Sequence, residues 1–546
     1  MRNARLTAPA ILSLTFATLV AGCLEHPLKE VEYSKVQVPK IPIVIHDNRD
    51  VDILFVIDNS GSMAEEQARL AKNFPTFISA LAIMNADYRI GITTTDVAHP
   101  GCRDYATPEN GALVLRSCTE GVAADAFKYG DIDAAFACTD QCTLSAEQLA
   151  LRPGLDGETH PWLESTLGET NLQAGVSMAA AFACFGPQGI DGCGFESPLE
   201  AMKLAIEQAR SPGGSGFMRD EALLSVVLVT DETDCSANPA QDIFTKNDVF
   251  WNDEAPRLTS GTCWRAGVAC TGEGPEFAEC HAEDFSADGE PGASRPEDAV
   301  LRPIDGYIEF LEGLRAGSAD PGDTGPHARE VLMSLIAGVP VGYDAGEAEL
   351  AFVAAAPGSP QQHNFGISPG CVNTEDGSNS TAVPPVRERE VAEAFADGDR
   401  NVYSICQDDY SPALTQIAKR IEEVLAPSCA GVCIADSNSD TPELEPECSI
   451  SATYRDGRDE LLPPCLAQDG AWATPAGVSV CFYMLTDPDH STKSTLDDMT
   501  LTKDERVPCS SDTSNLEFKI LRTGPRTPGV TYSADCVAAA DAHNCG

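Results

Sequence analysis

The sequence predicts an α/β fold: a doubly wound, mostly parallel sheet with long disulfide-bonded insertions, followed by a small β-rich, cysteine-rich domain. Three observations lead to this prediction. Between residues 48 and 428, short apolar runs alternate with amphipathic helical patterns, as expected of parallel strands covered by helices on both faces. Long segments rich in Gly, Pro, Asp and Cys interrupt this alternation. The last segment, 448–546, carries six cysteines and short β-like runs at 478–485 and 516–521.

Strands are expected where apolar residues run almost without interruption. These runs lie at 51–57, 88–94, 223–230, 331–337, 348–355 and 401–406. Helices are expected between them, at 65–81, 199–209, 304–314 and 412–425. Pro75 is expected to kink or split the first helix, whereas Ser197 and Pro198 form a typical helix start before the second. In such a sheet, ligands bind at the carboxyl ends of the strands.

The remaining segments are interpreted from their composition. Insertions are predicted at about 97–165, 237–300 and 356–398, and their cysteines indicate cross-linked loops on one face. The stretch 36–45 mixes prolines with β-branched residues and is expected to form an extended lead-in. Residues 429–447 are predicted to be an acidic linker, because the stretch holds two prolines and few apolar residues. Residues 448–546 then form a separate domain.

The N-terminus has the pattern of an export signal. Arg2 and Arg5 precede an apolar stretch at 6–20, which is too short to span a bilayer as a helix of ~20 residues. Residues 20–23, Val-Ala-Gly-Cys, resemble a bacterial lipobox, which implies cleavage after residue 22 and acylation of Cys23. Residues 23–47 are then a tether to the membrane. Leu24, rather than Asp, favours delivery to an outer membrane; the alternative is an ordinary secretory signal with a chance cysteine.

Cysteine usage supports an oxidising compartment. The chain has 21 cysteines, and removing Cys23 for lipidation leaves 20, enough for ten disulfides. Sequence does not determine the connectivity, but close spacing makes three pairs plausible: Cys138 with Cys142, Cys184 with Cys193, and Cys429 with Cys433. For Cys263, Cys270 and Cys280, the alternative to disulfides is a zinc site that they form with His281, although the spacings between these residues are wide.

The chain is strongly acidic. With 36 Lys and Arg against 84 Asp and Glu, the formal net charge is −48. This charge argues against nucleic acid and anionic membrane surfaces as partners. The acidic residues are spread along the chain, which is typical of a solvated surface and would raise the local concentration of divalent cations.

One motif carries the candidate chemistry. Asp58-Asn59-Ser60-Gly61-Ser62 stands directly between the first predicted strand and the first predicted helix. A carboxylate and two hydroxyls on one tight turn offer the hard oxygen ligands that Mg²⁺ prefers. The strand at 223–230 ends in a second carboxylate, Asp231, at the same edge of the sheet. The alternative is a turn and helix cap without a metal, since Asp and Ser are favoured there anyway.

These residues resemble the von Willebrand factor A family and its metal-ion-dependent adhesion site, Asp-x-Ser-x-Ser. The resemblance covers roughly 48–96, 192–236 and the later strand–helix units. It implies that a divalent cation, Mg²⁺ (or Mn²⁺ or Ca²⁺), is held directly or through water by Asp58, Ser60, Ser62 and Asp231. An acidic group of a partner would complete the metal's coordination shell.

The sequence departs from the family at one ligand position. The family places a Thr just before the helix that leads to the strand ending in its last aspartate, and here that position holds Glu196 and Ser197. Glu196 is the candidate replacement through its carboxylate, or Ser197 through its hydroxyl, whereas Thr170 lies one helix too early. Asp96 and Asp234 are candidates for a peripheral cation site.

The sequence therefore predicts a lipid-anchored protein of the cell envelope, bound to the outer membrane. Its predicted function is metal-dependent and non-catalytic binding of a protein or surface polymer that carries an acidic group. The alternative is a structural envelope or matrix protein in which the metal only stabilises the domain. A hydrolase is not favoured, because the string around Ser368 (366–370) lacks the strand and helix that a nucleophile elbow needs.

Overall fold

The computed structural model describes the chain from Lys40 to Cys545, apart from several short segments. The positions left out, besides 1–39 and 546, are 46–48, 84–85, 103–106, 155–156, 212–214, 220, 245–248, 252–257, 294, 317–328, 375–379, 397–399, 426, 439, 442, 455–456, 469, 502–506, 524–526, 528–529 and 542–544. The predicted signal sequence and Cys23 lie outside the described residues. None of the described helices combines the length and the apolar character needed to cross a membrane.

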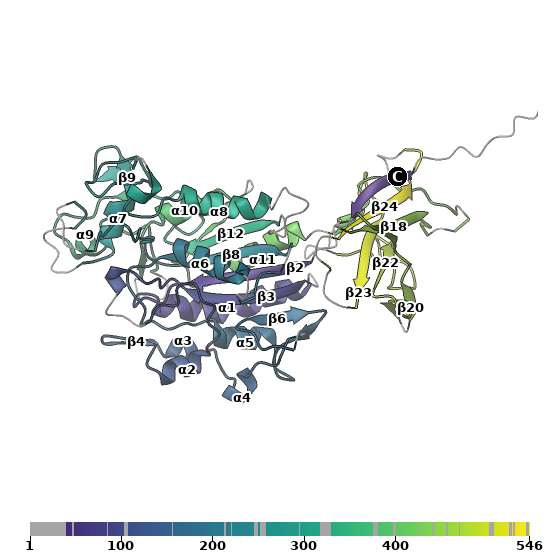
Figure 1. Ribbon diagram of the computed structural model, residues 1–546, viewed down its shortest axis with the longest axis horizontal. Helices are drawn as coiled ribbons and strands as arrows, with labels where there is room; N and C mark the ends of the chain where they lie inside the picture. The colour runs from purple at the N-terminus through teal and green to yellow at the C-terminus, as the bar shows by residue number, and fades with distance from the viewer. Residues whose placement is uncertain are drawn as a thin grey trace, which may run out of the picture. The chain divides into compact units, whose positions relative to one another are not determined.

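A seven-stranded sheet forms the centre of the α/β region (Figure 1). Its strands, in spatial order, are β16 (Val402–Ser404), β12 (Val331–Ala337), β8 (Leu223–Val229), β2 (Asp50–Ile57), β3 (Asp87–Thr94), β6 (Leu163–Thr166) and β7 (Glu169–Thr170). The first five are parallel, and β6 and β7 add an antiparallel edge. The predicted doubly wound, mostly parallel sheet is confirmed.

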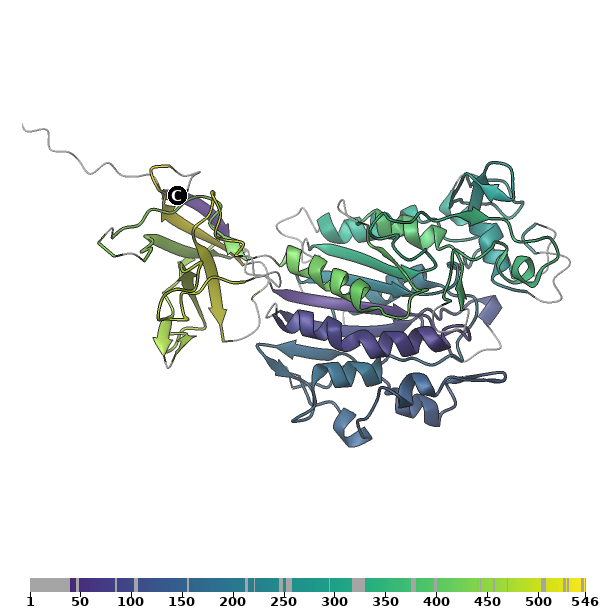
Figure 2. The ribbon, with the colours of Figure 1, turned by 180° about the vertical axis from the view of Figure 1, so that it is seen from behind.

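Helices cover both faces of this sheet, which explains why its central strands are apolar throughout. The odd-numbered residues of β2, such as Phe55, pack with α1 (Ala64–Ile83), α5 (Met178–Phe185) and α11 (Ser411–Val424). The even-numbered residues Leu54 and Val56 pack with α6 (Pro198–Arg210), α8 (Asp305–Ala316) and α10 (Val386–Glu393). Figure 2, seen from behind, shows α1 in purple and α11 in light green in front of the strands.

The order of the strands creates a switch point between β2 and β8. From β2 the chain passes through α1 to β3 on one side, and it later returns through α6 to β8 on the other. In the parallel register, Ile57 of β2 lies opposite Val229 of β8, so both strands end at the same edge. Connections that leave in opposite directions open a crevice at this edge, where open α/β sheets bind their ligands.

Two element predictions are wrong. The run at 348–355 is not a strand of the main sheet: only β13 (Phe352–Val353) forms, and it pairs with β10 (Glu276–Phe277) of an insertion. Phe352 packs there with apolar residues of the insertions, so this apolar run is buried without joining the main sheet. Conversely, β6 and β7 extend the main sheet from a region predicted as insertion and loop. The helix α1 continues through Pro75, so of the two expectations for this proline, a kink or a split, the split does not occur.

Ten disulfides link the 20 cysteines of the described chain. They join Cys102–Cys193, Cys118–Cys138, Cys142–Cys184, Cys235–Cys263, Cys270–Cys280, Cys371–Cys406, Cys429–Cys509, Cys433–Cys545, Cys448–Cys536 and Cys465–Cys481. The three closely spaced pairs and the zinc group are therefore wrong. Pairing follows proximity in space, and six of the ten bridges close loops of 30 or more residues.

The C-terminal part is antiparallel and also recruits the start of the described chain. One sheet contains β1 (Lys40–Ile45), β24 (Thr531–Val537), β18 (Cys448–Thr453) and β19 (Asp459–Leu461). A second contains β17 (Ser428–Cys429), β23 (Glu517–Arg522) and β22 (Val480–Leu485). The predicted tether thus contains a strand, because the β-branched residues of β1 pair with β24 along its whole length.

The stretch 429–447, predicted as a linker, is bonded to the C-terminal strands. Cys429 and Cys433 form disulfides with Cys509 and Cys545, and Ile434 forms a β-bridge with Ala538. These cross-links hold the stretch in place despite its acidic composition, which alone suggested a solvated linker.

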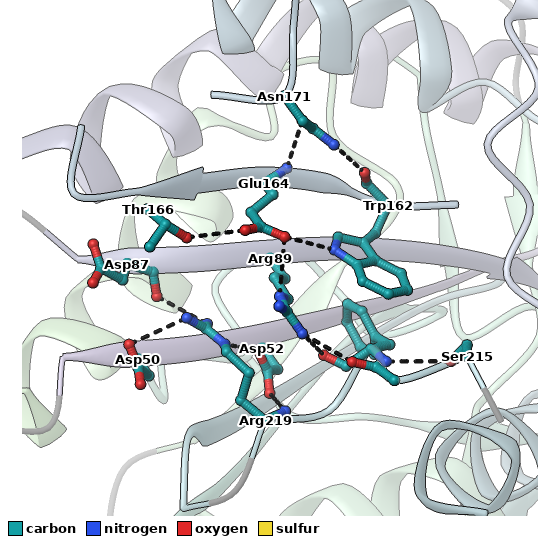
Figure 3. Close-up of polar contacts among 12 residues, drawn as sticks. Asp50, Asp52, Asp87, Arg89, Trp162, Glu164, Thr166, Asn171, Ser215 and Arg219 are labelled. Carbon is teal, nitrogen blue, oxygen red and sulfur yellow. Dashed lines mark hydrogen bonds and ion pairs between the residues drawn. The ribbon is translucent and has the colours of Figure 1, made fainter. Parts of the chain in front are cut away.

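A buried ion cluster closes the opposite edge of the main sheet, at the amino ends of the strands (Figure 3). Arg219 donates through Nε to Asp52 (2.9 Å) and through a terminal nitrogen to Asp50 (3.1 Å), and it also reaches the backbone carbonyls of Val51 and Asp87. Burial raises the pKa of Asp52, and the Arg219 guanidinium opposes that shift. The cluster shows how this fold neutralises carboxylates that lie in its interior.

We predict that Arg219→Met lowers the free energy of unfolding by about 3–5 kcal/mol, because it removes the guanidinium that is bonded directly to the fully buried carboxylate of Asp52. Urea denaturation measures the change. Arg219→Met combined with Asp52→Asn should recover part of the loss. The exposed pair of Arg295 with Asp298 supplies the control, since solvent screens this pair and Arg295→Met should cost much less. Equal costs for the two single variants would contradict the assignment.

Candidate metal centre

The loop that follows β2 is organised by the carboxylate of Asp58, which is completely buried. One carboxylate oxygen accepts a hydrogen bond from the backbone N–H of Ser60 (2.8 Å), which makes the turn tight. The other accepts from the Thr230 hydroxyl (2.6 Å) at the end of β8. Asp58 therefore ties the two strand ends together across the switch point.

A chain of side-chain contacts continues from this turn to Asp231. The hydroxyl oxygens of Ser60 and Ser62 lie 3.1 Å apart, and the Ser62 hydroxyl donates to Oδ1 of Asp231 (3.1 Å). Asp58, Ser60 and Asp231 are buried, whereas Ser62 is exposed. The four residues predicted from the motif thus lie together, with their carboxylates inside and one hydroxyl at the surface.

Glu196 lies just before α6 and is also buried. Its Oε2 accepts a short hydrogen bond from the Thr95 hydroxyl, while its Oε1 has no hydrogen-bond partner among the described residues. The Ser197 hydroxyl donates to the backbone carbonyl of Cys235 (3.1 Å). Of the two candidates for the family's Thr position, Glu196 therefore has an oxygen free and Ser197 is engaged with the backbone.

The two candidates for a peripheral cation site make structural hydrogen bonds. Asp96 accepts from the Asn59 side chain (3.2 Å) and from the backbone N–H of Cys193 (2.9 Å). Asp234 accepts from the Ser236 hydroxyl (2.6 Å) and from Nε of the buried Arg387 (3.1 Å). Both carboxylates thus hold neighbouring loops in place.

Thr170 lies away from this site. It belongs to β7 and pairs with Ser165, which in turn lies opposite Tyr88 near the start of β3. The register places Thr170 toward the amino end of β3, whereas Asp58 follows the carboxyl end of its neighbour β2.

Several residues around the loop were missed from the sequence. Gln67 donates to the backbone carbonyls of Asp58 (2.8 Å) and Gly189 (2.6 Å), and so fixes the loop to the start of α1. The ring of Tyr129, from the first insertion, lies against Gly61, where a Cβ atom would come within 2.5 Å of the ring. No sequence signal marks either residue, because their roles depend on chain segments that are distant in sequence.

Glu66 and Glu232 are further buried carboxylates near the site that were not predicted from the sequence. Glu232 follows Asp231 directly in the string Asp-Glu-Thr-Asp, and this position is a sequence signal that places it near the site. One oxygen of Glu66 and one of Glu232 lack a hydrogen-bond partner among the described residues. Together with Oε1 of Glu196, three buried carboxylate oxygens are left unsatisfied around the Asp58 loop.

The electrostatics of the site are dominated by buried negative charge. Burial is the largest cause that raises the pKa of Asp58 and Asp231, and the charge of Asp58 raises the pKa of Asp231 further. Burial also raises the pKa of Glu232 to about 8. Within the described part of the chain, no Lys, Arg or His forms a salt bridge with any of these three carboxylates.

These features fit a divalent cation of the hard class. Carboxylate and hydroxyl oxygens are suitable ligands for Mg²⁺, Mn²⁺ or Ca²⁺, and the unsatisfied buried oxygens are what such an ion would compensate. Only two groups of three Asp, Glu, His or Cys ligand atoms lie within 4.8 Å of one another among the described residues, and both contain disulfide-bonded cysteines. An ion at Asp58 would therefore be bound by hydroxyls as well as by carboxylates.

Comparison with known proteins adds little. No protein-family model and no curated protein matches the chain. Among solved structures, two of the pilus adhesin SpaC from Lactobacillus rhamnosus GG are similar, one of them in an open conformation, at 10% identity and TM-scores of 0.27 and 0.28. The similarity covers 90% of this chain and 40% of the adhesin, so the chain spans less than half of that protein. At such TM-scores, the likeness supports no conclusion about fold or function.

We predict that the metal-free protein loses stability as pH rises from about 5 to about 9. Burial raises the pKa of Asp96 to about 6 and that of Glu232 to about 8, so the native state holds these protons more tightly than the unfolded chain. The resulting stabilisation is complete below pH ~4, the pKa of these carboxyl groups in the unfolded chain. It is lost as pH rises through the pKa values that Asp96 and Glu232 have in the native state.

Urea denaturation in EDTA across this range tests the prediction. Glu232→Gln should flatten the upper part of the curve, whereas the exposed Glu312→Gln should leave it unchanged. A Glu232→Gln curve parallel to that of the wild type would show that Glu232 does not titrate in this window.

Proposed function

We propose that the α/β region is a von Willebrand factor A-like domain that binds a protein or surface polymer through a divalent cation, without catalysis. The observation that carries this proposal is the hydrogen-bonded set of Asp58, Ser60, Ser62 and Asp231 at the switch point of the sheet. These residue types, in this order on these strand ends, are the set that the family resemblance implies.

In this proposal, Asp58 and Asp231 provide the negative charge, and Ser60 and Ser62 provide neutral oxygens to a Mg²⁺ ion (or Mn²⁺ or Ca²⁺). When bound, the cation supplies an electrophilic position that an acidic group of the partner can occupy. The exposure of Ser62 supports access from solvent on one side of the site. Tyr129, which packs on Gly61 and is 41% exposed, is suited to contact whatever approaches that side.

Glu196 distinguishes this site from the family pattern. A carboxylate in place of Thr adds negative charge, which strengthens attraction for the cation but leaves it less electrophilic toward an acidic partner. Because Ca²⁺ accepts six to eight oxygen ligands, an additional carboxylate would be used more readily by Ca²⁺ than by Mg²⁺. The free Oε1 of Glu196 supports such a contribution.

A second candidate function, a structural envelope protein with a stabilising metal, is favoured by the deep burial of Asp58 and Asp231, which are 0% and 5% exposed. The two proposals differ in one respect. A stabilising metal raises the unfolding temperature without creating affinity for any acidic partner, whereas the binding function requires a chelator to release the partner.

The location is proposed from the same chain. Ten disulfides are typical of a protein from an oxidising compartment, so the chain functions outside the cytosol. We propose that acylated Cys23 anchors it to the outer membrane through the lipobox-like signal.

We predict that residues 24–546 bind Mg²⁺, Mn²⁺ or Ca²⁺ and that Asp58→Ala/Asp231→Ala weakens binding by more than about 100-fold, because loss of outer-shell groups alone costs about 10–100-fold. Isothermal titration calorimetry measures the affinities. Asp125→Ala/Asp133→Ala, which removes two exposed carboxylates of the first insertion, is the matched control. Equal affinity in the two double variants would rule out this site.

We further predict that Glu196→Gln weakens Ca²⁺ binding by about tenfold and Mg²⁺ binding by less, because the amide keeps the hydrogen bond from Thr95 but removes the charge. The same calorimetric titrations measure both ions. Unchanged affinity for both would show that Glu196 only holds the loop.

A further inference from the structure

A cavity is lined by residues of α7 (Gly261–Gly267), of α9 (Pro360–Phe365) and of the loops beside them. The two helices, labelled in Figure 1, belong to the second and third insertions. Its volume is about 580 Å³, within the range of small-molecule sites. The lining includes Trp251, Trp264, Arg265 and Gln362. None of these residues contributes to the metal centre.

The walls of this cavity are held rigidly. The hydroxyls of Thr259 and Ser260, at the start of α7, donate to the backbone carbonyls of His363 (2.6 Å) and Asn364 (3.2 Å) near the end of α9. The disulfide Cys235–Cys263 anchors α7 to the segment after β8. A cavity with fixed walls can bind a ligand without the cost of ordering loops.

Two tryptophans give the cavity its aromatic character. Gly366 lies so close to Trp264 that a Cβ atom there would come within 2.9 Å of the ring, so the backbone fixes the ring in position. The indole N–H of Trp251 is buried and has no hydrogen-bond partner among the described residues, although buried indoles usually find one. Neither ring stacks on another described aromatic ring.

Arg265 gives the cavity a positive charge. Its Nε donates to the backbone carbonyl of Phe250 (2.7 Å), which fixes the plane of the guanidinium. No carboxylate of the described chain lies within salt-bridge distance of Arg265. In a chain with 84 acidic residues and 36 basic ones, a half-buried guanidinium that no described carboxylate pairs with is suited to an anionic ligand.

Gln362 adds a planar polar group to the same wall. Its Oε1 accepts the backbone N–H of Gly358 (2.7 Å), which leaves its amino group without an acceptor among the described residues. The cavity thus presents the amino group of Gln362 and the guanidinium of Arg265, both of which are donors.

We propose that this cavity binds an acidic saccharide, with a uronic acid as the recognised unit. The negatively charged face of a tryptophan ring attracts the C–H groups on the flat side of a pyranose. The amino group of Gln362 takes a hydroxyl oxygen of the sugar, and Arg265 pairs with the carboxylate of the uronic acid, the geometry for which a guanidinium is best suited.

Nucleotides also stack on tryptophan, and a phosphate pairs with a guanidinium as a carboxylate does. The net charge of −48 argues against a long nucleic acid strand, so a single nucleotide is the competing ligand that the test includes. The site is independent of the proposed metal-dependent function, since no residue is shared. A chelator therefore separates the two.

The test uses residues 24–546 in EDTA, titrated with trimers of galacturonic acid and of glucuronic acid, a neutral galactose trimer and adenosine monophosphate. Tryptophan fluorescence and calorimetry report binding. We expect at least one acidic trimer to bind, and Arg265→Gln to weaken its binding by about tenfold or more, as expected for loss of a charge-assisted contact. Trp251→Ala should also weaken it, through loss of an aromatic surface of the cavity.

Arg458→Gln, at an exposed arginine of the C-terminal part, is the matched control and should bind as the wild type does. The proposal is overturned if neither acidic trimer binds, if Arg265→Gln binds them as the wild type does, or if adenosine monophosphate binds in preference to both. Thermal melting of each variant distinguishes loss of the site from loss of the fold.

Discussion

The hydrogen bond between the Thr230 hydroxyl and the Asp58 carboxylate is the constraint on which the rest of the site depends. It joins the carboxyl ends of β2 and β8, the two strands between which the sheet changes direction. The parallel register of these strands places Ser60 and Ser62 on one side of the junction and Asp231 on the other. Together with the bond from the Ser62 hydroxyl to Asp231, this contact fixes the turn that follows β2 relative to Asp231.

Buried carboxylates are expensive in any protein, and this chain neutralises several of them with arginine. At the amino ends of the strands, Arg219 pairs with Asp50 and Asp52; on the side of α10, Arg387 pairs with Asp234. Asp58 and Asp231 are not paired in this way, since they lie in the interior with hydroxyls as their neighbours and without a basic partner among the described residues. A bound cation is the compensation that this contrast suggests.

The sequence predicted the central part of the fold well, for physical reasons. Strands buried on both faces appear as uninterrupted apolar runs, so β2, β3, β8 and β12 were placed within one residue at each end. The motif after β2 and the carboxylate after β8 could be joined because parallel strands end at one edge. The edge strands β6 and β7 were missed, since they are short and only partly apolar.

What could not be predicted depends on contacts between distant segments. Disulfide pairing is set by the folded path of the chain, so the closely spaced pairs were wrong, and the acidic stretch 429–447 is held by bridges to Cys509 and Cys545. The same holds at the site: Tyr129 reaches Gly61 from an insertion, and Gln67 joins the Asp58 loop to Gly189. Glu196 was identified from its position before a helix, but its contact with Thr95 required the structure.

The most direct test of the central claim is a crystal of residues 24–546 grown with Mn²⁺, examined by anomalous scattering. The account predicts an anomalous peak among Asp58, Ser60, Ser62 and Asp231, with the nearest oxygens about 2.0–2.3 Å away. The account would be contradicted if Mn²⁺ were fully occupied at other carboxylates while the site at Asp58 held no ion. In that crystal, Asp58 would still be bonded to Thr230, and Ser62 to Asp231.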